Sequence, residues 1–271
     1  MTSALRTPAV AGRFYPRDGD ELRRDVLEYT SPDESTRIAA IGCIAPHAGY
    51  VYSGHVAGAV YSRMEIPRRV IVLCPNHTGM GHRLAIMTHT AWQMPFGEVA
   101  ADAELGAALV QRFPLLHEDS AAHRSEHAIE VQLPFLQMRR PDLSFVPIVV
   151  GVSDFDILRG LSEALADVIS AQPDKVLIIA SSDMNHYESD AVTRIKDHKA
   201  IARVLALDAL GLWEVVRKED ISMCGFGPSV AMLTAARRLH AKEATLVKYA
   251  TSGDVSGDYD KVVGYAGIVV S

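Results

Sequence analysis

Cysteine is scarce in this chain of 271 residues, which contains only Cys43, Cys74 and Cys224. So small and odd a number predicts no disulfide framework and is typical of a reducing compartment. Long apolar runs are also missing, since no segment reaches the roughly 18–20 uninterrupted apolar residues of a membrane helix. The first residues, MTSALRTPAVAGRFYP, contain no apolar run of signal-peptide length. We therefore expect a cytoplasmic protein that does not bind membranes.

An excess of positive charge is absent as well, because the formal net charge is -6. Neutralising phosphates requires a basic face, so we expect no nucleic-acid partner. The chain has no Gly-x-x-x-x-Gly-Lys-Ser/Thr loop, no paired Cys-x-x-Cys motifs and no Gly-x-Ser-x-Gly nucleophile elbow. Nucleotide hydrolysis and serine-hydrolase chemistry therefore lose support.

What the chain does have is an alternation of strand-sized apolar runs and helical patterns, within a composition that is 48% hydrophobic. The predicted strands are 38–45, 69–74, 83–88, 143–150, 175–181, 244–250 and 261–270. The predicted helices are 20–29, 54–64, 103–113, 155–171, 191–207 and 228–240. Continuous apolar strands alternating with helices predict an α/β fold, with a largely parallel or mixed central sheet flanked by helices. No repeat or long linker divides the chain, and 31–37 reads as a connecting loop, so we expect a single domain over 1–271.

Unusual polar clusters follow three of the predicted strands. His47 lies in APHAGYVYSG, His77 in CPNHTG, and Asp183 and His186 in SSDMNHY. Loops at the carboxyl ends of the strands converge in open α/β sheets, and neutral imidazoles are common ligands of zinc, copper and iron. A metal site is therefore one hypothesis, and satisfied surface or turn histidines are the other. Asp183 and His186 would face one cavity if a helical turn began there.

Two further clusters come from other parts of the chain. Cys224, in SMCGFGP, lies upstream of a predicted helix with Pro228 at its first position. A helix N-terminus lowers a thiol pKa and favours the metal-binding thiolate; the alternative is a small apolar residue in a glycine-rich turn. In SEHAIEVQLPF, His127 would reach the site from the start of a helix, while Glu126 and Glu130 are either its partners or a solvated face.

Together these clusters resemble the Memo family, whose prokaryotic members are known as component B of the AmmeMemoRadiSam system. The resemblance covers essentially the whole chain, and its longest pieces are specific. In chain order the matching pieces are AVAGRFYP at 9–16, PHAGYVYSG at 46–54, PNHTG at 75–79, SEHAIEVQLPFL at 125–136, SSDMNH at 181–186 and MCGFGP at 223–228.

The resemblance implies a fold like that of the class III extradiol dioxygenases, which bind non-haem iron. The family's metal positions fall on His47, His77 and Cys224. Asp183 and His186 match the remaining site positions, and His127 matches a histidine near that cavity. Because an imidazole suits proton transfer near neutrality, we expect His186 to act as a general acid or base, with Asp183 as a further candidate metal ligand. The dioxygenases use two histidines and a carboxylate. A cysteine in the carboxylate position therefore argues against ring cleavage.

These observations lead to three functional hypotheses. The first is a redox enzyme that uses iron or copper and acts on an unidentified small molecule, such as a phenol. The second is a non-catalytic module that binds a peptide or ligand in the dioxygenase-like pocket, lined by Tyr50, Tyr52, Trp92 and Phe226. The third is a zinc hydrolase, since zinc also suits histidine and cysteine ligands. The system name of the family further implies a radical-SAM protein as a partner.

Overall fold

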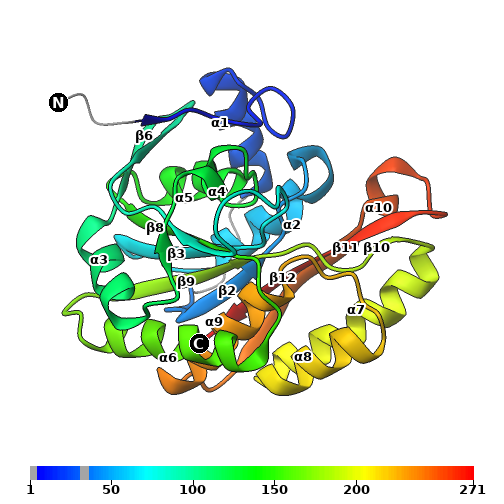
Figure 1. Ribbon diagram of the computed structural model, residues 1–271. Helices are drawn as coiled ribbons and strands as arrows, with labels where there is room; N and C mark the ends of the chain where they lie inside the picture. Colours follow the sequence, from blue (N-terminus) through cyan, green and yellow to red (C-terminus); the bar gives the residue numbers. More distant parts are fainter. Residues whose placement is uncertain (1–4, 31–36) are drawn as a thin grey trace.

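Continuous apolar runs rich in β-branched residues form the centre of the sheet in the computed structural model, which describes residues 5–30 and 37–271 (Figure 1). Such residues suit strands that are buried on both faces. All of VLIIAS is buried, for example. Four parallel strands lie side by side in the order β8 (Ser144–Val150), β3 (Arg69–Cys74), β9 (Val176–Ser181) and β2 (Gly42–Ala45).

Antiparallel pairs at both sides of this centre make the sheet mixed. Next to β2 comes β12 (Val262–Val270), which also pairs with β11 (Ala244–Thr251) and β10 (His186–Glu188). The other edge of β8 is shared by two strands: β6 (Gly97–Ala101) pairs with its first residues and β4 (Leu84–Ile86) with its last. Beyond β6 come β5 (Ala91–Met94) and β1 (Leu5–Arg6), and β4 also pairs with β7 (His117–Glu118).

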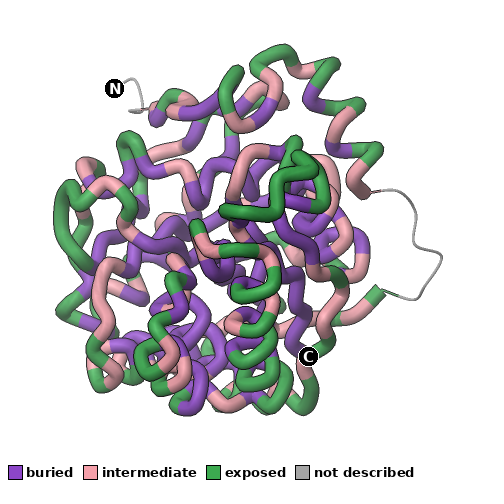
Figure 2. Tube along the Cα trace, turned by 90° about the vertical axis from the view of Figure 1, so that its right-hand side faces the viewer, coloured by how far each residue is buried: buried purple, intermediate pink, exposed green. Residues whose placement is uncertain are grey.

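Helices cover both faces of the sheet, and each face has its own apolar core (Figure 1). Below the sheet in that view lie α3 (Ala103–Arg112), α6 (Phe155–Ser170), α7 (Asp190–Leu205), α8 (Ala209–Lys218) and α9 (Phe226–Arg238). Above it lie α1 (Gly19–Tyr29), α2 (Tyr50–Arg63), α4 (Ala121–Arg124), the 3-10 turn η1 (Glu130–Gln132) and α5 (Leu133–Arg139). The short α10 (Gly253–Ser256) connects β11 to β12. Figure 2 shows the buried residues gathered between these layers.

The fold class predicted from the sequence is confirmed: one α/β unit contains a mixed central sheet flanked by helices. Every predicted strand and helix has a counterpart, and the largest shifts are at the starts of β2 and α2, each four residues from its predicted start. The predicted loop at 31–37 lies, except for Arg37, outside the described residues. Within the described part of the chain, no helix combines the length and apolarity that crossing a membrane requires.

Candidate metal centre

The carboxyl ends of β2, β3 and β9 bring the predicted site residues together. His47 follows β2, His77 follows β3 and Cys224 lies in the turn before α9. One ligand atom from each of these three residues lies within 4.8 Å of the other two. His47 is buried, Cys224 is half-buried and His77 is exposed, so the group connects the interior with solvent. The sheet topology thus gathers residues that are far apart in sequence, as expected for neighbouring strand ends.

The hydrogen bonds around His47 define which of its ring nitrogens carries the proton. The Ser181 hydroxyl donates to the carbonyl oxygen of Ala128 at 2.6 Å, so it can only accept from His47 Nδ1 at 3.0 Å. Gln132 donates to the same hydroxyl at 2.8 Å. We therefore assign the proton to Nδ1, which leaves the Nε2 lone pair 3.2 Å from Cys224 Sγ. Burial, followed by the neighbouring His77, lowers the pKa of His47 well below its usual value, so this ring is neutral.

The Glu126 carboxylate determines which ring nitrogen of His77 carries the proton, as Ser181 does for His47. Its carboxylate accepts the His77 backbone N–H at 2.7 Å, the His77 Nδ1–H at 2.9 Å and the Ala128 N–H at 3.0 Å. Burial raises the pKa of Glu126, but the hydrogen bond and charge of His77 outweigh it and bring this pKa to about 2. Because an ionised carboxylate only accepts hydrogen bonds, His77 Nδ1 carries the proton and Nε2 is free to bind a metal.

Cys224 departs from the expectation that a helix N-terminus lowers its pKa. Burial, and then the Asp183 carboxylate, raise the pKa of this thiol above its usual value. The helix α9 begins at Phe226, two residues before the predicted start, so Pro228 is its third residue. The N–H of its cap, Gly225, is taken by the Ser182 hydroxyl at 3.0 Å. The sulfur does accept the Asp183 N–H at 3.3 Å, but burial and the nearby carboxylate dominate.

His127 adds a third imidazole to the group. Its ring stacks on His77 with centroids 4.6 Å apart and meets His47 edge-on at 5.4 Å. Burial, as the largest cause, lowers the pKa of His127 to about 4, so this ring too is neutral at pH 7. The residue was expected at the start of a helix, but it lies before the 3-10 turn η1. His127 thus faces both predicted imidazole ligands.

Asp183 and His186 lie at the edge of the group and are not on a helical turn, contrary to one expectation. Asp183 Oδ1 accepts the His47 backbone N–H at 2.7 Å, and Oδ2 is 4.0 Å from His47 Nε2. Burial raises the pKa of this carboxyl. His186 begins β10, and its Nδ1 donates to the Ser222 carbonyl oxygen at 2.9 Å. A carbonyl oxygen only accepts, so His186 Nε2 has a free lone pair when the ring is neutral.

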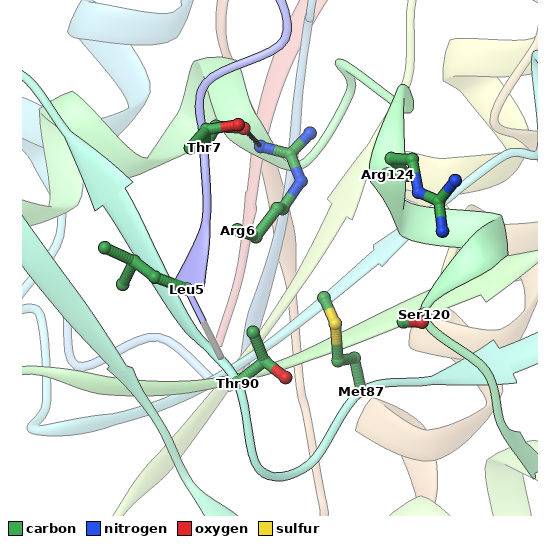
Figure 3. Close-up of a pocket in the computed structure, with 7 residues that line it drawn as sticks. All are labelled: Leu5, Arg6, Thr7, Met87, Thr90, Ser120 and Arg124. Atoms are coloured by element: carbon green, nitrogen blue, oxygen red, sulfur yellow. Dashed lines mark hydrogen bonds between the residues drawn. The ribbon is translucent and has the colours of Figure 1, made fainter. Parts of the chain in front are cut away.

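The predicted aromatic groove is wrong in part, because Tyr50 and Trp92 are core residues that are 3% and 0% exposed. Trp92 packs under the guanidinium of Arg6, 3.8 Å from the ring centroid. Arg6 also lines a separate cavity of about 370 Å³. Figure 3 shows its side chain with those of other lining residues, among them Met87 and Arg124. Of the four proposed lining residues, Tyr52 is exposed and Phe226 is half-buried. An aromatic groove built from all four residues is therefore excluded.

The residues that orient the imidazoles were either not predicted from the sequence or left with an undecided role. Ser181 and Gln132 were not singled out, and Glu126 was left between a partner and a solvated face. Ser181 and Gln132 do lie inside the SSDMNH and EVQLPFL segments, next to residues that were singled out. The signal was therefore present, but serine and glutamine at such positions are equally common as packing residues.

Comparison with known proteins identifies chains that are similar over nearly their whole length. A family model described as Memo-like protein matches residues 6–269. A MEMO1 family protein of Methanopyrus kandleri is 43% identical over 97% of this chain and 98% of its own, and one of Desulfurococcus amylolyticus is 41% identical over the same shares. The crystal structure of an uncharacterized protein from Escherichia coli K12 covers 84% of this chain and 98% of its own, with a TM-score of 0.57. At 12% identity, that last likeness shows the fold alone.

Proposed function

The chain belongs to the Memo-like protein family, and from this premise we propose that it is a metal-dependent redox enzyme acting on a small molecule. One observation carries the proposal: the ligand atoms of His47, His77 and Cys224 lie within 4.8 Å of one another. In both imidazoles the hydrogen bonds assign the proton to Nδ1, so Nε2 is the free donor atom. The three residues therefore suit a metal chemically as well as by distance.

The chemistry of the donor set favours iron or copper, with zinc as the alternative. Two neutral imidazoles and one thiolate form a softer set than two imidazoles and a carboxylate. A bound iron or copper ion would supply one-electron redox chemistry, whereas zinc would supply Lewis acidity. A small substrate would approach the group from its exposed side, at His77, whose side chain is 31% exposed.

The remaining site residues are proposed to handle protons and to hold the ligands. His186, with Nδ1 fixed on Ser222 and Nε2 free, is the proposed general acid or base. His127 is neutral, and its ring contacts both imidazole ligands, so it would contact a substrate bound there. Asp183 fixes the backbone of His47 and keeps a carboxylate oxygen near the ligand atoms. A cytoplasmic location and a radical-SAM partner are further parts of this proposal, and both rest on the sequence.

The test is the metal content of protein purified without oxygen. We expect wild type to contain close to one iron or copper per chain and the double variant His47→Ala/Cys224→Ser to contain almost none. His198→Ala is the matched control, because His198 is an exposed histidine on α7, and it should keep the metal. Iron or copper that stays in the double variant would refute the assignment of these ligands. Zinc alone, with no redox activity, would favour the hydrolase hypothesis.

A further inference from the structure

We propose that Glu126 is a positioning residue of this centre, which holds His77 as the Nδ1–H tautomer and so presents Nε2 to the metal. The inference rests on the proposed function, because it assigns a task within the same site. Glu126 is fully buried and comes from the segment before η1, whereas His77 follows β3. The contact therefore joins two parts of the chain that only the fold brings together.

The hydrogen bonds of Glu126 identify it as an acceptor for His77 and not as a metal ligand. By distance alone, His77, Glu126 and His127 form a second group of potential ligands. However, Oε2 accepts the His77 N–H, while Oε1 accepts both the His77 Nδ1–H and the Ala128 N–H. These two donors occupy both lone pairs of Oε1, so a metal bound to that oxygen would have to displace one of them. Two of the three N–H groups come from His77, so one carboxylate fixes both the backbone and the ring of that residue.

Arg6, which lies in β1, keeps the backbone of Glu126 in place. Arg6 donates from Nη2 to the Glu126 carbonyl oxygen at 2.8 Å and from Nε to the His123 carbonyl oxygen at 2.9 Å. Its remaining nitrogen forms a 2.6 Å ion pair with the buried Glu130, which also accepts the hydroxyl of Tyr15 at 2.7 Å. Arg6 thus holds the backbone around Glu126, while the Ala128 N–H holds its carboxylate. The position of the His77 ring is therefore imposed by the protein.

Glu126→Gln is the informative variant because it keeps the size of the side chain. An amide has one accepting oxygen and one donating nitrogen, so it cannot accept all three N–H groups. We expect the His77 ring to lose its fixed Nδ1–H tautomer. We also expect the affinity for Zn²⁺ to fall by about 10-fold to 100-fold, as for other partners of metal-bound histidines. Asp102→Asn is the control, since Asp102 is a buried carboxylate that pairs with Arg69 at the opposite end of β3.

Two measurements on the full chain test the proposal. In metal-free protein, long-range ¹H–¹⁵N NMR of the histidine rings should report Nδ1–H for His77 in wild type and in Asp102→Asn, but not in Glu126→Gln. The His77 signal is identified by its loss in His77→Ala. Competition titration with Zn²⁺ should then show weakened binding only in Glu126→Gln, at unchanged circular dichroism. An unchanged tautomer with unchanged affinity in Glu126→Gln would overturn the positioning role. Wild type that binds none of zinc, iron and copper, with the tautomer shift present, would instead overturn the proposed function and leave the orientation of His77 by Glu126 established.

Discussion

At the scale of single residues, the properties of the site follow from which atoms carry protons. His47 and His77 each donate Nδ1–H to an oxygen that cannot donate in return, Ser181 Oγ and Glu126 Oε1. His47 Nε2 therefore faces the third ligand, with Cys224 Sγ 3.2 Å away, and Nε2 is also the free donor atom of His77. The thiol is the exception, because its pKa is raised and it keeps its proton at neutral pH. A metal must displace that proton before the sulfur can bind it as thiolate.

This leads to a prediction about pH. The pKa of Cys224 lies above its usual value, so its thiol proton competes with the metal between pH 6 and 8. The pKa of His47 lies well below its usual value, so no proton on its Nε2 competes with the metal in this range. The affinity for Zn²⁺ should therefore rise by close to one order of magnitude per pH unit in this window, as expected for the release of about one proton. Competition titrations at several pH values measure the slope. Cys224→Ser should flatten it, and an equal slope in that variant would contradict the assignment.

The sequence was sufficient for the ligand candidates and insufficient for their partners. His47, His77 and Asp183 could be singled out because each follows a buried strand, where side chains converge. Glu126 could not be decided, since its segment has the polar spacing of an ordinary solvated helix face. Its buried position involves Arg6, which lies 120 residues away in sequence and donates a hydrogen bond to its backbone carbonyl oxygen. A contact between residues so far apart leaves no local pattern in the sequence.

At the scale of elements, the approach of α9 to the end of β9 positions Cys224. A Cβ atom added at Gly225 would lie 2.5 Å from the Ser181 carbonyl oxygen and 2.5 Å from the Ser182 Cβ. Only glycine lets the helix start this close to the strand. The Ser182 hydroxyl, which accepts the Gly225 N–H, fixes the approach. The α9–β9 contact thus belongs to the site as well as to the core.

We predict that Gly225→Ala destabilises the protein by about 1–3 kcal/mol, the usual cost of forcing an extra methyl group into a packed region. It should also weaken Zn²⁺ binding, because the strand end and Cys224 must move apart. Urea unfolding and zinc titration measure the two effects. The control is Gly49→Ala, where the nearest atom to the added Cβ is 3.7 Å away. Equal effects of the two substitutions would contradict the role given to this contact.

The strongest patterns predicted the elements well, and tertiary contacts explain the main differences. The centre of the sheet was predicted because β-branched apolar runs suit strands that are buried on both faces. The helix α2 begins four residues early because Tyr50 is held from outside it: its N–H donates to Phe14 O at 2.7 Å and its hydroxyl donates to Val131 O at 2.7 Å. The hairpin of β5 and β6 was missed, since its short strands are half-exposed and carry little periodicity.

At the scale of the whole molecule, the sheet separates two apolar cores, and polar side chains are buried around them as well as at the site. His123 illustrates the cost of this arrangement. It is fully buried, packs edge-on against Trp92 and lies near the Arg6 guanidinium. Burial and the charge of Arg6 lower the pKa of His123 to about 4. The folded protein therefore keeps His123 neutral under conditions in which an unfolded chain would protonate it.

This predicts a loss of stability in mild acid. Above pH 6.5 His123 is neutral in both states and contributes no pH dependence. Between pH 6.5 and 4 only the unfolded chain gains the proton, so the free energy of unfolding falls as the pH falls, by up to about 3 kcal/mol for this one residue. His127, whose pKa is also about 4, should add a comparable loss in the metal-free protein.

Urea unfolding at pH 7.5, 6 and 5 measures the slope. His123→Gln should be less stable at pH 7.5 yet lose less on acidification, whereas the exposed His198→Gln should keep the wild-type slope. Parallel slopes for wild type and His123→Gln would contradict this role and move the acid sensitivity to other groups such as His127. Glu126, with a pKa of about 2, would add its own loss only below pH 4.5.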